Sequence, residues 1–295
     1  MSSGILVVDK PSGWTSHRVV GRCRRLLGTR KVGHAGTLDP MATGVLVIGV
    51  GRGTRLLGHL ALTSKTYLAT IRLGQATNTD DADGEVTASA GAAGLTDTAI
   101  ETALVPLRGD IVQVPSTVSA IKIGGQRAYA LARRGEQVDL PGRPVTVSRF
   151  DVLTRRNTDA DGVRVIDLDV VVDCSSGTYI RALARDLGNA LGTGGHLTAL
   201  RRTRVGGFTL DRALTPDELT AEPPRAPELT PLGSVARAHF ACLDLDDDQA
   251  RDVRHGRPLD LRLAAEPTAL LHDEQLLALY RPDDARAVPV AVLVG

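Results

Sequence analysis

Helical and strand-like apolar patterns mix along this chain without the regular alternation that builds a parallel α/β fold. Residues 45–50 form a short apolar run typical of a buried strand, and residues 163–174 give a second strand pattern. Residues 66–73 alternate, and one face of this segment carries Tyr67, Ala69, Ile71 and Leu73. The patterns predict an α+β fold with a mixed, largely antiparallel sheet and flanking helices.

Two segments place apolar residues at helical spacing. The first begins near Ser16, which we expect to cap the helix, and ends at Gly28. The second begins near Thr178 and ends at Gly192. The polar face of the first helix carries Arg18, Arg22 and Arg25. Such a face is either a solvated surface or a phosphate-contacting one, and the local sequence leaves both open.

A proline-rich segment divides the chain. Residues 215–233 hold five prolines, which interrupt helices and central strands, so we expect an extended linker there. Residues 239–295 contain eleven acidic and six basic side chains, a net charge of −5, and show short strand-like runs. We predict a larger domain over residues 1–214, a linker over 215–233 and a small all-β domain over 234–295.

The basic side chains near the N-terminus surround a single acid. Between Lys10 and Leu60 the chain has nine Lys and Arg residues and one carboxylate, Asp39, although the net charge of the whole chain is only +1. A basic region of this kind attracts nucleic-acid phosphates. Asp39 is then either a turn residue before Pro40 or a carboxylate used as a nucleophile or base, and the local sequence alone favours the turn.

The sequence lacks the signals of several other classes of protein. The three cysteines are isolated, which suits a reducing compartment, and the seven histidines show no metal-ligand spacing. Residues 49–53 lack the full dinucleotide-loop pattern. Residues 79–84 resemble a calcium loop, but Ala90 stands where a bidentate Glu is needed, so we interpret residues 79–84 as a hairpin turn. No signal sequence or membrane-spanning run is evident, and we expect a cytoplasmic protein.

Arg181 has an unusual position. It lies with Tyr179 in the predicted first turn of the second helix, where the helix dipole is positive and a cation is disfavoured. An Arg at such a position is stabilised if it reaches an anion, either a phosphate or a nearby carboxylate. A basic turn follows at Arg201, Arg202 and Arg204, and for each of these a solubilising role remains plausible.

Six ordered blocks carry a resemblance to a known family. They are Ile5–Ser16 (ILVVDKPSGWTS), Gly33–Leu46 (GHAGTLDPMATGVL), Ser64–Tyr67 (SKTY), Arg72–Gly84 (RLGQATNTDDADG), Ser175–Leu183 (SSGTYIRAL) and His196–Thr203 (HLTALRRT). From Ile5 to about Phe208 the chain resembles the bacterial tRNA pseudouridine synthase B (TruB) family. One departure is visible, because Pro115-Ser116 stands where the family usually has Pro-Pro.

The resemblance implies the pseudouridine synthase fold and an isomerase. The reaction would detach uracil from its ribose, rotate it and rejoin it through C5, which requires neither a cofactor nor a metal. Asp39 matches the catalytic aspartate of the family, whether it attacks C6 or acts at the ribose. Arg181 matches the arginine that pairs with this aspartate and keeps it ionised, and Tyr67 matches a tyrosine stacked on the target base. The remaining matches are His34, where the base leaves the helical stack, and Tyr179 and Leu200, which line the uracil pocket.

The implied substrate is tRNA, at uridine 55 of the T-loop. Residues 113–143 resemble the family's insertion that grips this arm, with a short helix from Gln126 to Arg134, and residues 234–295 stand where the family has a PUA-type domain. The candidate tRNA contacts are Arg18, Arg22, Lys122, Arg127, Arg133, Arg134 and Arg202. We expect a monomer with no obligate protein partner and no membrane association.

Two rival functions differ in class. One is an RNA-binding or tRNA-folding protein that retains the fold without catalysis, and the other is a synthase guided by RNA within a larger complex. The presence of Asp39, Tyr67 and Arg181 argues against the first, and the short chain without basic tails argues against the second. Because every implied pocket residue precedes Thr203, we expect a chain ending near Leu232 to retain the reaction.

Overall fold

The computed structural model describes residues 3–116, 122–123, 126–127, 140–222 and 225–294. Contacts between residues group the chain into two compact units. Unit 1 comprises residues 1–40, 44–62 and 204–295, and unit 2 comprises residues 41–43 and 63–203. The N-terminal strands therefore belong to the same unit as the C-terminal part of the chain.

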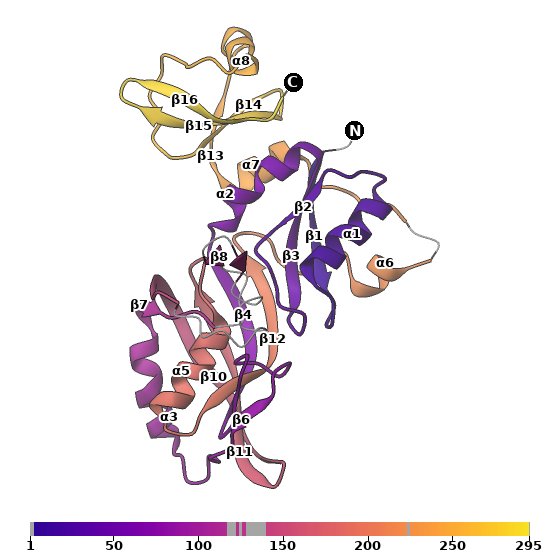
Figure 1. Cartoon of the computed structure of the whole chain (residues 1–295). Coiled ribbons are helices and arrows are strands. Elements are labelled where there is room, and N and C mark those ends of the chain that lie inside the picture. Colours follow the sequence, from indigo (N-terminus) through magenta and orange to yellow (C-terminus); the bar gives the residue numbers. More distant parts are fainter. Residues whose placement is uncertain (1–2, 117–121, 124–125, 128–139, 223–224, 295) are drawn as a thin grey trace. The chain divides into compact units, whose positions relative to one another are not determined.

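In unit 1, three antiparallel strands pack against the first helix. Strand β1 (Gly4–Lys10) pairs along its whole length with β3 (Thr43–Val50), and β2 (Val32–Ala35) pairs with the end of β3. Helix α1 (Ser16–Leu26) lies beside these strands (Figure 1). It buries its apolar face, including Val19 and Cys23, against strand side chains such as Leu46 and Ile48. The predicted helix is confirmed, but its cap is Thr15, whose side-chain oxygen accepts a hydrogen bond from the Arg18 amide.

The C-terminal part of unit 1 contains a four-stranded sheet. Its strands, in the order β13-β14-β15-β16, are β13 (Ala241–Asp244), β14 (Thr268–His272), β15 (Gln275–Asp283) and β16 (Arg286–Val292). Helix α8 (Asp247–Arg254) packs on this sheet through Ala250 and Val253. The sequence did not predict this helix, because only these two of its residues are buried. The strand-like runs are confirmed as strands, whereas the all-β description omits α8.

The proline-rich segment packs along β1. Helix α6 (Pro216–Thr220) has a capping box between Thr215 and Glu218, and its proline occupies the first turn, where no amide hydrogen is required. The backbone of Thr230 exchanges two hydrogen bonds with Ile5, at 3.0 and 2.8 Å. The described part of this segment is thus bound to the sheet, unlike the extended linker that we expected.

One hydrophobic core joins the N-terminal strands to the C-terminal sheet. Ile5 and Val45 belong to the same buried cluster as Val235 of helix α7 (Leu232–His239) and Leu279 of β15. Two short helices, η1 (Gly51–Arg55) and α2 (Leu57–Ala61), contribute Leu56 and Leu60 to this cluster. Residues beyond Leu232 therefore complete the core around the N-terminal strands.

Unit 2 is built on a sheet with the strand order β12-β4-β11-β10-β7. The strands are β12 (Gly195–Val205), β4 (Lys65–Leu73), β11 (Val163–Cys174), β10 (Arg143–Ala160) and β7 (Gly109–Gln113). The pairs β4–β11, β11–β10 and β10–β7 are antiparallel, which confirms the predicted sheet type. Helices α3 (Asp97–Leu104) and α5 (Ile180–Ala190) flank this sheet (Figure 1). Gly188 lets α5 approach closely, because an added Cβ would lie 2.2 Å from the carbonyl carbon of Gly194.

The two faces of β4 have different roles. Tyr67, Ala69, Ile71 and Leu73 are buried, as the alternation predicts. The opposite face is polar, with Thr70 donating to Asp169 at 2.8 Å and Arg72 bound to Asp167 at 2.8 Å, both acids being on the paired strand β11. Hydrogen bonds from Arg156, Thr154 and Thr70 hold the pKa of Asp169 well below its usual range. This face therefore carries acids that are paired with arginines, Asp167 with Arg72 and Asp169 with Arg156.

The predicted RNA-gripping insertion is only partly described. Strands β8 (Lys122–Ile123) and β9 (Gln126–Arg127) form a short antiparallel pair. The helix predicted from Gln126 is wrong at Gln126–Arg127, because these residues pair as a strand. Residues 128–134 of that prediction, including Arg133 and Arg134, lie outside the described residues.

The shared core predicts that the C-terminal part cannot be removed without loss of folding, in contrast to the expectation from the sequence that a chain ending near Leu232 retains the reaction. A chain ending at Leu232 loses Val235, Leu279 and the other C-terminal members of the cluster that contains Ile5. Each deleted large apolar side chain costs roughly 2–5 kcal/mol, and a typical domain has a stability of only about 5–15 kcal/mol. We expect the truncated chain to show no cooperative unfolding transition in a denaturant titration followed by circular dichroism.

A full-length Val290→Ala variant serves as the control, because Val290 is 41% exposed and lies outside that core. It should unfold cooperatively, near the midpoint of the unaltered chain. A truncated chain with a cooperative transition at the full-length midpoint would contradict the shared core.

Candidate active site

The backbone on both sides of Asp39 is fixed within unit 1. Ser16 Oγ, at the start of α1, accepts from the Leu38 amide at 3.0 Å and donates to the Leu38 carbonyl at 3.1 Å. On the other side, the Pro40 carbonyl accepts from Lys10 Nζ at 3.1 Å and from the Gly13 amide at 2.9 Å. Asp39, which is half-buried, therefore occupies a loop anchored before and after it.

Lys10 has a structural role. Its side chain is fully buried, and its ammonium group also donates to the carbonyls of Pro11 and Trp14 at 3.0 and 2.6 Å. The sequence suggested Lys10 only as one of the bases that attract a polyanion. In the structure the ammonium group instead ties the loop at Asp39 to the segment before α1, because three carbonyl oxygens satisfy its three donors.

His34 lies near the same loop of unit 1. It belongs to β2, opposite Ile48 of β3, and its ring packs edge-on against His17 of α1. The ring centroids are 5.5 Å apart and the planes make an angle of 82°. His17 was not recognised from the sequence, because nothing in a single pattern links a helix position to a strand position.

Unit 2 carries the predicted pocket residues of the sheet. Tyr67 is 6% exposed on β4, opposite Val172 of β11, and Leu200 is 8% exposed on β12. The strand alternation correctly predicted the buried face for Tyr67. Within this unit, the two side chains are buried on neighbouring strands, β4 and β12.

Tyr179 is held through its backbone. It is the N-cap residue of α5 and makes no side-chain capping bond. Gln113 of β7, which is 2% exposed, accepts from the Tyr179 amide at 2.7 Å and donates to the Tyr179 carbonyl at 3.0 Å. Gln113 thus fixes the backbone of the residue that precedes the helix carrying Arg181.

Arg181 reaches a carboxylate inside unit 2. Its Nη1 donates to the Thr79 carbonyl at 2.9 Å and lies 3.3 Å from Asp81 Oδ2, and both side chains are almost fully buried. Asp81 is further held by hydrogen bonds to its Oδ1 from Thr79 Oγ1 at 2.6 Å and from the Asp83 amide at 3.1 Å. The expectation that Arg181 contacts an anion is confirmed for Asp81, and its pairing with Asp39 stays a prediction.

Asp81 was missed for a clear reason. Residues 78–85 form the turn between β5 (Ala76–Thr77) and β6 (Val86–Ala88), so the predicted hairpin is confirmed. Its acids were dismissed with the calcium-loop alternative. The available signal was Arg181 itself, since a cation in a first helical turn requires an anion, but the sequence does not indicate which one.

Two buried cations lie close together on the sheet of unit 2. Arg202 of β12 is 1% exposed, and Lys65 of β4 is 6% exposed. Burial and the nearby Arg202 charge lower the pKa of Lys65 to about 8. This degree of burial argues against Arg202 as a surface phosphate contact.

Two arginines of α1, Arg22 and Arg18, differ in burial and in their contacts. Arg22 is 9% exposed and binds the Leu219 and Ala221 carbonyls at 2.6 and 2.9 Å and Glu222 at 2.9 Å. Arg18 is exposed and stacks on Trp14 instead. Arg22 therefore links α1 to α6, and this role replaces the tRNA contact that we predicted for it.

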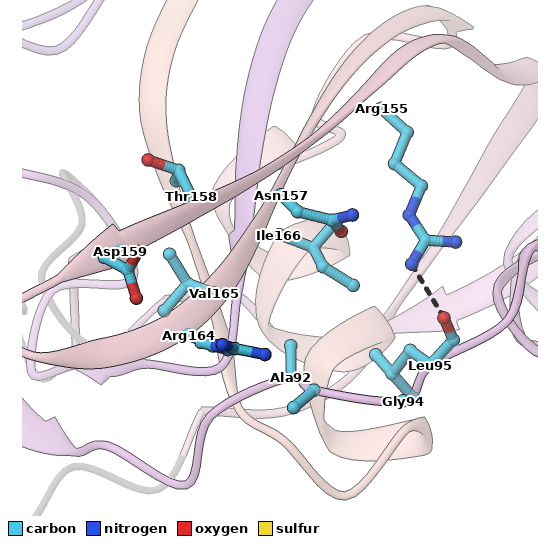
Figure 2. A pocket seen from close by; sticks show the side chains of 11 residues that line it. Ala92, Gly94, Leu95, Arg155, Asn157, Thr158, Asp159, Arg164, Val165 and Ile166 are labelled. Carbon is cyan, nitrogen blue, oxygen red and sulfur yellow. Dashed lines mark hydrogen bonds between the residues drawn. The ribbon is translucent and has the colours of Figure 1, made fainter.

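A cavity of about 400 Å³ in unit 2 is separate from the predicted site residues. It lies between residues 92–95 and the β10–β11 hairpin, where Arg155 donates to the Leu95 carbonyl at 2.7 Å (Figure 2). Arg155 also forms an ion pair with Asp97. None of the predicted site residues lines this cavity, so it is not the candidate uridine pocket.

The described part of the chain contains no group of three or more His, Cys, Asp or Glu residues placed to hold a metal ion. No helix in that part is long and apolar enough to cross a membrane.

The fold is shared with solved structures. One is a chain from an H/ACA RNP bound to a substrate RNA containing 2′-deoxyuridine, with a TM-score of 0.70 and 24% identity, covering 99% of this chain and 85% of that one. Another is a chain from a Cbf5-Nop10-Gar1 complex, with a TM-score of 0.69 and 25% identity, covering 98% and 83%. At such identities the likeness supports the fold, which is that of the pseudouridine synthases.

Sequence comparison then gives the family. Residues 24–180 match the model of the TruB family pseudouridylate synthase N-terminal domain, residues 181–226 match the tRNA pseudouridylate synthase B C-terminal domain, and residues 240–294 match the C-terminal part of tRNA pseudouridine synthase II. The chain belongs to the TruB family of pseudouridylate synthases and is an isomerase.

Similar curated relatives are named tRNA pseudouridine synthase B. One from Mycobacteroides abscessus is 56% identical over 292 residues, covering 99% of this chain and 96% of the relative. One from Nocardia farcinica is 58% identical, with 98% and 93% covered, and one from Rhodococcus jostii is 59% identical, with 99% and 94% covered. The resemblance found in the six sequence blocks is thereby confirmed.

The anchoring of the Asp39 loop predicts the effect of Ser16→Ala. This variant leaves the Leu38 amide and carbonyl without the partner that they share, and both groups are buried. Such a loss costs about 1–3 kcal/mol. We expect a lower midpoint of denaturant unfolding and slower pseudouridine formation.

Ser234→Ala is the matched control, because Ser234 is exposed on α7 and makes no side-chain hydrogen bond to a described residue. It should resemble the unaltered chain in both measurements. If Ser16→Ala were also indistinguishable from it, the anchoring role of Ser16 would be wrong.

Proposed function

We propose that this enzyme converts uridine 55 in the T-loop of tRNA into pseudouridine. The observation that carries the proposal is the match to relatives named tRNA pseudouridine synthase B over nearly the whole chain, at 56–59% identity for the three named here. The basic N-terminal region around the anchored loop of Asp39 supports an RNA substrate, since Lys and Arg neutralise phosphates.

Asp39 is the nucleophile or base of the proposed reaction. The bond between N1 of uracil and C1′ of ribose breaks, the base rotates, and C5 bonds to C1′. The hydrogen on C5 is released as a proton and N1 takes up a proton, so the product is an isomer of the substrate. A carboxylate can form a transient bond at C6 of the base, or act at the ribose, and both routes require it to be ionised. The anchored backbone supports this role, because it limits the positions that the carboxylate can adopt.

Arg181 supplies the positive charge that keeps Asp39 ionised. An opposite charge close to a carboxylate stabilises its charged form. The contacts of Arg181 with Thr79 and Asp81 restrict the guanidinium group, so its direction is set before substrate binds. Gln113 supports the same helix by fixing Tyr179.

The target uridine must leave the folded loop. Flipping a base out of its stack costs a few kcal/mol, which stacking and backbone contacts offset. Tyr67 is proposed to stack on the flipped base, with Tyr179 and Leu200 lining its pocket and His34 taking the place that the base leaves. The buried strand positions of Tyr67 and Leu200 support this assignment.

The remainder of the tRNA is proposed to bind without another protein. The described contacts leave Arg18 exposed, and Lys122 and Arg127 lie on the β8–β9 pair. The acidic balance of residues 239–295 favours only limited phosphate contact there. We propose a cytoplasmic monomer that recognises the T-arm alone, whereas the similar solved chains come from complexes with further components.

The role of Asp39 is tested by Asp39→Asn, which keeps the shape of the side chain and removes its charge. We expect turnover to vanish while the affinity for a T-arm hairpin stays within a few-fold, since loss of an anion from a basic surface should not weaken phosphate binding. Release of tritium from hairpin labelled at C5 of uracil measures turnover, and filter binding measures affinity.

Asp159→Asn provides the control, because Asp159 is an exposed acid of β10 with no ion pair to a described residue. It should react at the normal rate. Turnover by Asp39→Asn at that same rate would remove Asp39 from the mechanism, and an inactive unaltered enzyme would favour the non-catalytic RNA-binding alternative.

Arg181→Lys tests the proposed partner of Asp39. Lysine keeps the charge but loses the planar, multidentate guanidinium group. We expect the single-turnover rate at saturating hairpin to fall by orders of magnitude, with little change in affinity. A change in affinity alone would identify Arg181 as a phosphate contact.

A further inference from the structure

Trp14, His17 and Arg18 gather beside His34 around the start of α1, and the proposed mechanism gives the first three no role at the target uridine. Arg18 Cζ lies 4.1 Å from the centroid of the Trp14 ring, and His17 packs edge-on against His34 at 5.5 Å. All four residues belong to unit 1. His17 and Arg18 are exposed, and Trp14 and His34 are partly exposed, so the group is accessible to a ligand.

The side chain of Arg18 is preorganised to bind an anion. Stacking on the indole ring restricts its rotamers, which reduces the entropy lost when the guanidinium group binds. Arg18 forms no ion pair with any described residue, and the first turn of α1 contains no acid. Arg22, one turn further along, shows the contrast, because it is buried and bound to Glu222. Only the first of these two arginines can offer its guanidinium group to a phosphate.

His17 positions the ring of His34. An edge-on contact between rings favours one orientation of each, and His34 comes from β2 while His17 comes from α1. Capping of the helix does not require His17, since Thr15 provides the side-chain cap. An exposed imidazole beside a second ring also offers a surface on which an unpaired base can stack.

We propose that Trp14, His17, Arg18 and His34 form an RNA-binding subsite, the α1 subsite, for a nucleotide that flanks the target uridine. Its phosphate binds Arg18, its base packs against His17, and His17 holds His34 in the orientation that the flipped loop requires. His17 is thus a positioning residue. This inference rests on the proposed function, because a flanking nucleotide presupposes an RNA substrate with a flipped uridine.

Arg18→Ala tests the phosphate contact by binding of a T-arm hairpin at several salt concentrations. Loss of one phosphate contact should reduce the slope of log affinity against log salt by about one. Arg149→Ala is the matched control for the loss of one positive charge, because Arg149 is exposed on β10 and already bound to Asp151 at 2.7 Å. Its slope should equal that of the unaltered enzyme. An unchanged slope for Arg18→Ala would overturn this part of the subsite.

His17→Ala and His17→Phe test the positioning role. Loss of the ring should weaken hairpin binding at least about fivefold and slow single turnover, whereas phenylalanine retains an edge-on ring and should restore most of both. Thermal unfolding distinguishes this role of His17 from a merely structural one. If His17 were only structural, His17→Ala would have a lower melting temperature and an unchanged affinity for the hairpin. That result would overturn the proposal.

The same measurements distinguish failure of the proposed function from failure of the α1 subsite. If the unaltered enzyme forms no pseudouridine in the hairpin, the proposed function fails whatever the variants do. If it forms pseudouridine and His17→Ala binds and reacts normally, only the α1 subsite fails.

Discussion

The fixed backbone around Asp39 is the constraint on which the rest of the structure depends. Ser16 holds Leu38, and Lys10 holds Pro40, so the carboxylate lies on a loop with little freedom of movement. Both anchoring residues come from β1 and the start of α1, whose positions are set in turn by burial against β3. The strands of unit 1 therefore serve as a support for one carboxylate, and preorganisation of this kind is what lets a single acid act on a bound base.

The two units contribute different parts of the proposed chemistry. Unit 1 carries Asp39 and His34, and its core extends into the C-terminal sheet through residues such as Leu279. Unit 2 carries Tyr67 and Arg181, with Arg181 fixed by Asp81. Each unit thus uses a buried polar contact to orient a functional side chain, and hydrogen bonds compensate the cost of burying these charges.

Local periodicity predicted much of the fold, and long-range contacts could not be predicted from it. Strand alternation placed Tyr67 on the buried face of β4 because that face follows from a period of two alone. Arg18 and Arg22 look equivalent on one helix, yet Arg22 binds Glu222, 200 residues away. Asp81 was missed for the same reason. The proline-rich segment was misjudged because composition shows where a regular element ends, and not which surface the following chain packs on.

The central claim is that this chain isomerises one uridine in the T-loop of tRNA. Its most direct test is the mapping of pseudouridine at single-nucleotide resolution in an unmodified full-length tRNA transcript, before and after incubation with the pure enzyme. The account predicts a single new pseudouridine at position 55, formed without an added cofactor or metal. A new pseudouridine at another position, or none in a transcript that the enzyme binds, would contradict it.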